Sequence, residues 1–480
     1  MIDSPTEPTL GRFPRLENRS ATIGLTLTAV AACVATVACW TEPRLVFLAT
    51  GLWALAILLI PVAADRNYEA VSVWSSVGLT VIIGVTLRGA SLTFRYPDGE
   101  RLDTLYFLGH EPHEFFYPAV LLIVGLLMLS LGYLRRKPQP SLTVVPFSRS
   151  DQSLLLVCIA LLSVSVVATA LYLRATGSAD GNWSGKREVI PDLDLAGSGY
   201  ESHGILRFLA SLAIFGHLLA VAEALSSKKH RPFWWTTAGI FLLVASVAPF
   251  HASLRTTVAW QFLMPAAMII AARRRRALPI LIGFGIVVVL SLFVLTTMRS
   301  ASDDRDAGWD SPTAARLFDA VVLNRNQIDL PKTAHIVRAV PSELPLQYGA
   351  TIARWALAPI PRRLWPDKPV IPPGPVVGHT LYDQHVAGVP PSLVAEWYWN
   401  FGWPGVILGC FGFGVLLRAV QHRFGTGISR DPFRSALFVA GPMILGFEAV
   451  GSSLGSGLFR AGLHTAVMAA LLFLIRVRKD

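Results

Sequence analysis

Cysteine, charged residues and long polar segments are all scarce in this sequence of 480 residues. The four cysteines, Cys33, Cys39, Cys158 and Cys410, lie within hydrophobic runs, which excludes a disulfide framework or a cysteine metal site in the polar segments. Charged residues make up only 15% of the chain and hydrophobic residues 53%, a balance far from that of a soluble globular domain. The composition therefore predicts a polytopic membrane protein.

The hydrophobic residues are gathered in runs of roughly 16 to 22, about the length that a helix needs to cross a bilayer. We count about twelve such runs and predict an all-α fold in which each run is a transmembrane helix. The predicted spans are residues 21–40, 45–64, 71–88, 115–134, 153–173, 204–225, 233–250, 256–272, 277–298, 402–420, 435–450 and 454–475.

The first span follows a polar segment that carries Arg12, Arg15 and Arg19, an arrangement typical of a signal anchor. A cleaved signal is the competing interpretation, because Val30 to Cys33 resembles a lipoprotein cleavage box. The apolar run continues past that box to full spanning length, so we expect the segment to be retained.

Basic residues concentrate in alternate short connections, and this bias predicts the orientation. They place both termini on the cytoplasmic side and account for most of the net charge of +11, so we expect no nucleic-acid partner. The predicted organisation is a tail (1–20), a membrane domain of about nine spans (21–298), a large extracytoplasmic loop (299–401), about three further spans (402–475) and a second tail (476–480).

A second set of arginines falls at the outward ends of the predicted spans, against this bias. Each could reach lipid headgroups on its own. Together they would suit a ligand that bears phosphate, because guanidinium binds phosphate bidentately and stays charged when partly desolvated. The set is Arg44, Arg88, Arg174, Arg207, Arg255, Arg299 and Arg460.

The large loop is the only long polar interval, and its sequence changes character along its length. We expect helix from about Pro312, and a short amphipathic segment along the membrane surface over 348–357. Seven prolines between 359 and 375 then forbid regular helix and impose a stiff path. This region holds the string PRRLWPDKP (361–369), and Glu396 follows shortly before WNFG (399–402).

These strings, with Gly378, Tyr382 and the Pro-Pro-Ser at 390–392, resemble the Wzy-type polymerases of bacterial O-antigen and oligosaccharide repeat units. The match covers about 45 residues, and the predicted topology supports it. The segment from His251 to Arg255 also resembles a serine-x-x-arginine turn of polymerases and O-antigen ligases, although it departs from the tighter form of that turn.

The resemblance implies a GT-C-like glycosyltransferase of the bacterial inner membrane. Its donor and acceptor would both be oligosaccharides on undecaprenyl diphosphate, and the growing chain would pass to a nonreducing-end hydroxyl of the next unit. Membrane lipids would surround the enzyme, and a flippase and a chain-length regulator of the same pathway are possible partners. The chemistry requires no cofactor and no metal, because arginine and lysine can stabilise the diphosphate leaving group.

On this basis we assign candidate roles. The diphosphate would be bound by Arg255, Arg362, Arg363 and Lys368, with Arg88 and Arg207 from the outward arginines. Glu396 would be the general base or position the acceptor, with Asp304 and His385 as second candidates. The alternatives are a lipid anchor for the arginine pair and a structural carboxylate for Glu396.

Aromatic and amide side chains near the strings would contact sugar rings, and we assign this role to Trp365, Tyr382, Tyr398 and Asn400. The competing interpretation for the aromatic residues is the belt at the membrane interface. The segment His110-Glu-Pro-His113-Glu suggests a metal site only weakly, because its two histidines flank a proline in a loop.

Two other functions fit the spans. An O-antigen ligase would use the same donor with a lipid-anchored core as acceptor. A transporter or flippase would place its functional charges near the bilayer midplane and show related halves, and no internal repeat is visible in this sequence.

Overall fold

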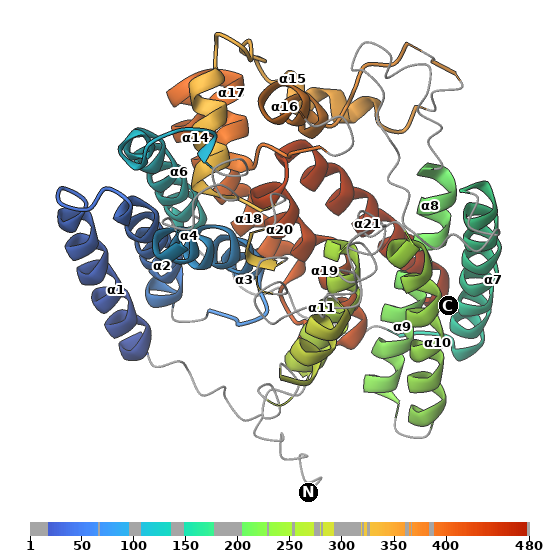
Figure 1. The fold of residues 1–480 in the computed structure, drawn as a ribbon. Helices are drawn as coiled ribbons and strands as arrows, with labels where there is room; N and C mark the ends of the chain where they lie inside the picture. The colour runs from blue at the N-terminus through green and yellow to red at the C-terminus, as the bar shows by residue number, and fades with distance from the viewer. Residues whose placement is uncertain are drawn as a thin grey trace, which may run out of the picture.

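The computed structural model describes residues 18–65, 68–95, 107–135, 148–176, 204–227, 230–251, 255–272, 279, 282–291, 318, 321–323, 327–360, 364–365, 367–383 and 388–477. Within these ranges the chain is helical, and extended pairing is limited to one isolated bridge between Arg149 and Arg476. The prediction of an all-α protein is confirmed for this part of the chain (Figure 1).

Ten helices are long and apolar enough to cross a membrane, as expected of a multi-pass membrane protein. Several consist of consecutive helical elements, and shorter apolar helices at Thr257–Ala272 and Ile282–Ser291 fall on two further predicted spans. The ten are α1 (Asn18–Ala38), α2 (Leu45–Ala64), α3–η1–α4 (Val73–Val81, Ile82–Leu87, Arg88–Arg95), η4–α6 (Pro112–Phe115, Phe116–Arg135), α7 (Asp151–Ala175), α8–α9 (Gly204–Ser211, Ala213–Ser226), α10 (Arg231–His251), α17–η9–α18 (Leu393–Pro404, Gly405–Gly409, Cys410–Phe424), α19–α20 (Pro432–Ala440, Pro442–Gly451) and α21 (Leu454–Ile475).

Polar side chains cap several of these helices where their first backbone N–H groups would otherwise lack partners. In each case a side-chain oxygen of the residue before the helix accepts a hydrogen bond from an amide of the first turn. The capping residues are Ser72, Ser150, Asp431 and Ser453.

The long helices form two groups joined by α18 to α21 (Figure 1). One group contains α1, α2, α4 and α6, and the other contains α7 to α10. At one end of the bundle the start of α7 meets the end of α21, because the Ser150 N–H donates to the Ile475 carbonyl at 3.0 Å. We call this the closed end and the opposite end the loop end.

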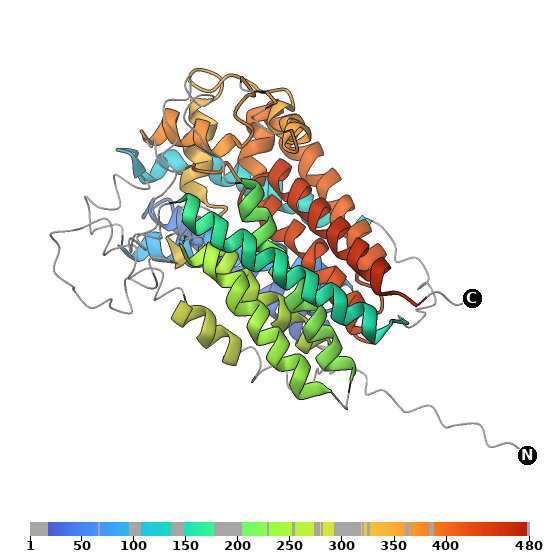
Figure 2. The same ribbon diagram turned by 90° about the vertical axis from the view of Figure 1, so that its right-hand side faces the viewer.

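Short helices from the predicted large loop cover the loop end (Figure 2). They are α14 (Leu330–Ala339), α15–η8 (Ala350–Ala353, Arg354–Leu357) and α16 (Pro373–Tyr382), which pack with the first part of α17. A core shared by α14, α16 and the first part of α17 contains Ile336, Ala339, Val340, Leu344, Val377, Val389, Ala395 and Trp399. The element at 350–357 coincides with the amphipathic segment expected there. We call this set of short helices the cap layer.

A sharp break separates the cap layer from the next span. Gly402 has φ 63° and ψ −148°, a conformation that is essentially restricted to glycine. The break turns α17 back so that the Trp397 indole lies against Gly409, twelve residues further along the chain. It coincides with the boundary at 401/402 that the sequence predicts between the large loop and the following span.

Candidate functional site

The chain segment that leads into α14 penetrates the membrane domain. Gly84 is the middle residue of the 23-residue helix Val73–Arg95, and a Cβ built on it would lie 2.0 Å from the Ile328 carbonyl oxygen. Closer to the closed end, the Thr80 hydroxyl donates to Gln327 Oε1 at 2.6 Å. Since helical residues rise about 1.5 Å each, residues 327–328 lie near mid-span. We call 327–339 the re-entrant segment.

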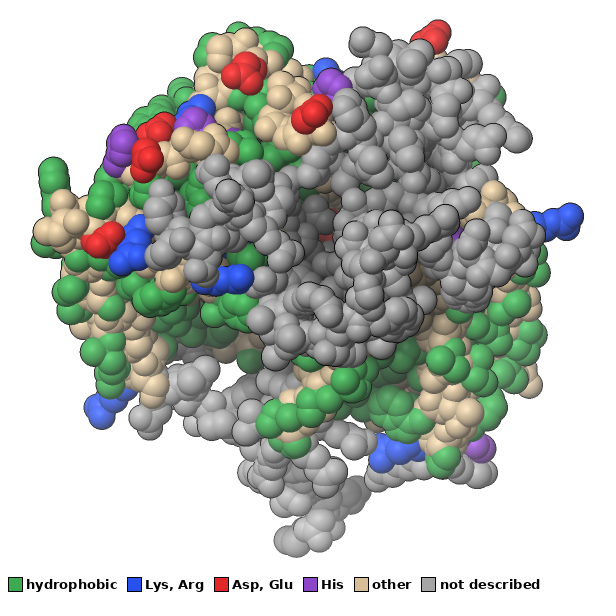
Figure 3. Space-filling view, in the orientation of Figure 1, with side chains coloured by type: hydrophobic (Ala, Val, Ile, Leu, Met, Phe, Trp, Pro, Cys, Tyr) green, Lys and Arg blue, Asp and Glu red, His purple; other side chains and the backbone are tan. Residues whose placement is uncertain are grey.

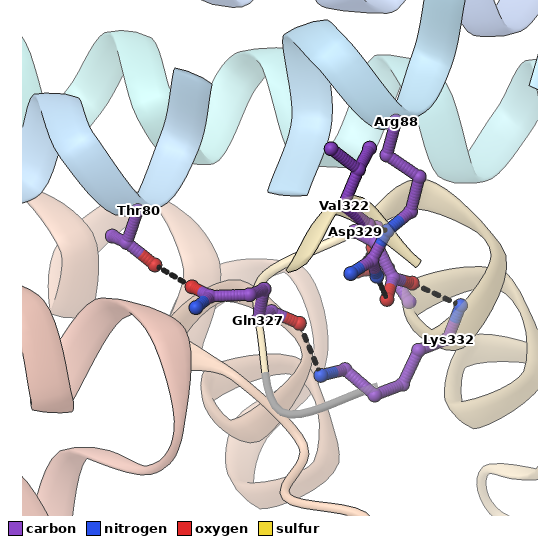
Figure 4. Close-up of polar contacts among 7 residues, drawn as sticks. Thr80, Arg88, Val322, Gln327, Asp329 and Lys332 are labelled. Carbon is purple, nitrogen blue, oxygen red and sulfur yellow. Dashed lines mark hydrogen bonds and ion pairs between the residues drawn. The ribbon is translucent and has the colours of Figure 1, made fainter. Parts of the chain in front are cut away.

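Opposite charges are buried where this segment turns into α14 (Figure 4). The Arg88 guanidinium forms an ion pair with Asp329 and donates from Nε to the Val322 carbonyl at 2.7 Å. Asp329 also caps α14, because its Oδ1 accepts from the Lys332 N–H at 2.6 Å. The Lys332 ammonium donates to the Gln327 carbonyl. Two cations and one carboxylate are thus shielded from solvent in the protein interior.

The position of Arg88 corrects the predicted end of the third span. The hydropathy pattern predicts that the span ends at Arg88, whereas the helix continues through Arg95 by way of the π-helical stretch Ile82–Leu87. Arg88 is therefore an interior residue of the helix and fully buried. Asp329 neutralises its charge at that depth, where an unpaired arginine would be costly. Its assignment to the diphosphate stays a prediction.

Asn400 is fully buried and holds the cap layer to α17. Its Nδ2 donates to the Thr351 hydroxyl at 2.7 Å and to the Glu396 carbonyl at 2.7 Å, and its Oδ1 accepts from the Gly349 N–H at 2.7 Å. These bonds use both amide hydrogens and one oxygen lone pair. In this state Asn400 has a structural role, and a sugar contact would require these bonds to break.

The Glu396 side chain lies at the start of α21. It is 1% exposed, and its Oε2 accepts from the Leu454 N–H at 2.6 Å. A carboxylate at this position stabilises the N-terminus of α21 through the helix dipole. The geometry corresponds to the alternative of a structural carboxylate bonded to backbone. Its assignment as the general base stays a prediction.

Lys368 and Trp365 lie in one tight turn of the proline-rich region. The Lys368 ammonium donates to the carbonyls of Ala358 at 3.2 Å and Ile360 at 2.7 Å, and the side chain is buried. These carbonyls follow η8 in a proline-rich stretch, and proline has no backbone N–H to donate to them, so the ammonium supplies the missing donor. Trp365 is 37% exposed and accessible to a ligand from solution.

The remaining predicted residues have these positions. Tyr382 and Tyr398 are half-buried against the core of the cap layer, and Arg207 is half-buried in α8. Arg255 is the first residue of α11 (Arg255–Ala272). Residues outside the described ranges are Asp304, Arg362, Arg363 and His385.

A cluster that the role assignments omit lies where η4 meets α14. Glu114 Oε2 lies 3.1 Å from His110 Nδ1 and 3.3 Å from the Arg338 guanidinium, which also donates to the Glu114 carbonyl at 3.0 Å. Burial lowers the pKa of Arg338 and Glu114 opposes that shift. The guanidinium remains charged because arginine does not deprotonate in proteins. The buried His335 ring lies between His110 and Tyr382, with centroids at 5.6 and 5.8 Å.

We call His110, Glu114, His335, Arg338 and Tyr382 the histidine cluster. Figure 3 shows histidine, acidic and basic side chains side by side at this corner of the loop end. Three segments contribute, from the second predicted outer loop, α14 and α16, so no local pattern could reveal the cluster. The one sequence signal was the motif His110-Glu-Pro-His113-Glu. Among the described residues no three potential ligands are grouped to hold a metal ion.

Comparisons of the chain with protein-family models, with curated proteins and with solved structures give no match.

Proposed function

We propose that the protein is a membrane glycosyltransferase that polymerises oligosaccharide repeat units carried on undecaprenyl diphosphate into a surface polysaccharide. In this proposal the loop end faces outward from a bacterial inner membrane, and the fold serves as a GT-C-like scaffold. A hydroxyl of one lipid-linked unit attacks the anomeric carbon of the other, and undecaprenyl diphosphate leaves.

One observation carries the proposal: the described residues of the segment that resembles Wzy-type polymerases pack in and beside a cap layer that is fastened to the spanning helices. The Gly349 and Glu396 bonds fix this layer to α17 and α21, and the Asp329 pair fixes it to α4. A lipid-linked donor needs such a place, because its prenyl chain stays in the bilayer while its sugar is in water.

The test is the surface polysaccharide profile after deletion of the gene, with lipid-linked intermediates extracted in parallel. The polymerase proposal predicts loss of long chains while single repeat units remain attached to the acceptor. Long chains that accumulate on undecaprenyl diphosphate would instead indicate the ligase. Unchanged glycans would contradict both activities.

A transporter of a lipid-linked or small substrate is the second candidate, and the re-entrant segment favours it. Irregular backbone at mid-span is tolerated only where protein or a cavity surrounds it, and transporters use such broken helices at their substrate sites. The buried Arg88, Asp329 and Lys332 lie there. Movement of labelled substrate across vesicles that contain the protein, without any glycosidic bond formed, would support this candidate over the enzyme.

A further inference from the structure

The histidine cluster contains the arrangement that a general base requires. Glu114 receives three donors: the Glu111 N–H at 3.0 Å on Oε1, and His110 Nδ1 and Arg338 on Oε2. A carboxylate so surrounded by donors is held in its ionised, acceptor-only form. His110 Nδ1 must then carry a hydrogen to bond to it.

This bond fixes the tautomer and the direction of the imidazole. With the hydrogen on Nδ1, the neutral ring presents a lone pair at Nε2. The His110 side chain is 33% exposed, and Nε2 makes no hydrogen bond within the part of the chain that the structure describes. A carboxylate that orients an imidazole from one nitrogen, with the other open, is the geometry of base catalysis at a hydroxyl.

Aromatic rings extend from His110 toward Tyr382, a residue already assigned to sugar contact. The His110 and His335 rings are inclined at 33°, and Tyr382 meets His335 edge-on at 88°. His110 and Tyr382 thus both contact the His335 ring, which places the imidazole and the residue assigned to sugar in one cluster. Glu396, by contrast, is buried on the side of α17 that faces α21.

We propose that His110, oriented by Glu114, is the general base that accepts the proton of the attacking sugar hydroxyl, and that Tyr382 binds the acceptor. The inference rests on the proposed function. The hydroxyl oxygen bonds to the anomeric carbon and its proton passes to His110 Nε2. The carbon–oxygen bond to the diphosphate breaks with its electron pair on undecaprenyl diphosphate, and the imidazolium returns its proton to water.

The test compares His110→Gln with His113→Gln in the purified full-length protein, supplied with lipid-linked repeat units in proteoliposomes. His113 is exposed, lies in the same turn and serves as the matched control. We expect His110→Gln to lower kcat by about 10²- to 10⁴-fold with little change in acceptor KM. His113→Gln should keep the wild-type rate.

The pH profile distinguishes a base from a structural residue. Since only neutral imidazole accepts a proton, a base at this position predicts that wild-type kcat falls at acidic pH and that His110→Gln loses this dependence. Among the residues that the structure describes, the other titratable or charged groups around the ring are Glu111, His113 and Glu114 from its own segment, His335 and Arg338 from α14, and Tyr382 from α16.

Two further variants keep the test decisive. Glu114→Gln retains a side chain that can close the capping box of η4 but removes the negative charge, so kcat should fall without unfolding. Added imidazole should restore part of the rate to His110→Ala. A wild-type rate and pH profile in His110→Gln would overturn this inference alone, whereas no transfer by the wild-type protein would overturn the proposed function with it.

Discussion

Replacement of Asp329 by asparagine tests whether the buried ion pair fastens the re-entrant segment. Asparagine is as good a helix cap as aspartate, so Asp329→Asn should leave the start of α14 intact. It removes the carboxylate that forms the ion pair with Arg88. Removal of one partner from a buried pair costs about 3–5 kcal/mol, because the remaining charge is left uncompensated.

The matched control is Glu42→Gln, since Glu42 forms a pair with Arg44 at 3.0 Å in which both side chains are well exposed. An exposed pair contributes about 0–1 kcal/mol, so this variant should unfold almost as the wild type does. The assay is equilibrium unfolding in mixed micelles of increasing denaturing detergent, followed by tryptophan fluorescence.

A double variant separates charge from packing. Arg88→Met together with Asp329→Asn removes both charges, so it should be more stable than the sum of the two single effects by about 0.5–3 kcal/mol. If Asp329→Asn lost no more stability than Glu42→Gln, or if the two single effects simply added, the pair would not be the anchor of the segment.

Two other substitutions test the packing of the loop end. Gly84→Ala places a methyl group against the Ile328 carbonyl and should destabilise the protein by about 1–3 kcal/mol. The control is Gly78→Ala, which has open space around it on the same helix and should be neutral or stabilising. Equal thermal unfolding midpoints for the two variants would contradict the close approach at Gly84. Asn400→Ala removes three hydrogen bonds at a cost of about 1–3 kcal/mol for each buried group left unpaired. It should speed proteolysis of residues 347–360, and an unchanged cleavage rate would refute the anchoring role.

The sequence predicts the membrane helices well because a spanning helix is encoded locally, in a run of about 20 apolar residues. Each predicted span has a helical counterpart, including the short helices near 257–272 and 282–291. The exception is the end at Arg88. A charged residue normally marks the end of a span. The sequence around Arg88 does not predict that its charge is neutralised by Asp329, which lies 241 residues away.

The re-entrant segment could not be read as part of the membrane domain, because it is short and polar. Asp329 followed by Leu330 and Pro331 is a good helix start, but a capping pattern carries no information about depth. Gly84 lets the Ile328 carbonyl approach because it has no side chain, but a glycine in a single sequence does not predict such a contact.

The sequence identified residues at the junction of the loop and the next span, but it did not reveal the contacts that they make. Glu396 and Asn400 do lie at the junction of the loop and the next span, yet both make buried structural bonds. Sequence proximity cannot show that the face of α17 that carries these two residues packs against α21 and the cap layer. The histidine cluster was not predicted as a unit, because His335, Arg338 and Tyr382 lie more than two hundred positions along the chain from His110 and Glu114.

The polymerase proposal is tested most directly by transfer with the purified protein in proteoliposomes that contain only undecaprenyl-diphosphate-linked repeat units. A polymerase should give a ladder of products that grows by one repeat unit at a time, with one undecaprenyl diphosphate released for each unit added. Repeat units that remain single, in vesicles where the protein is folded and the donor is accessible, would contradict it.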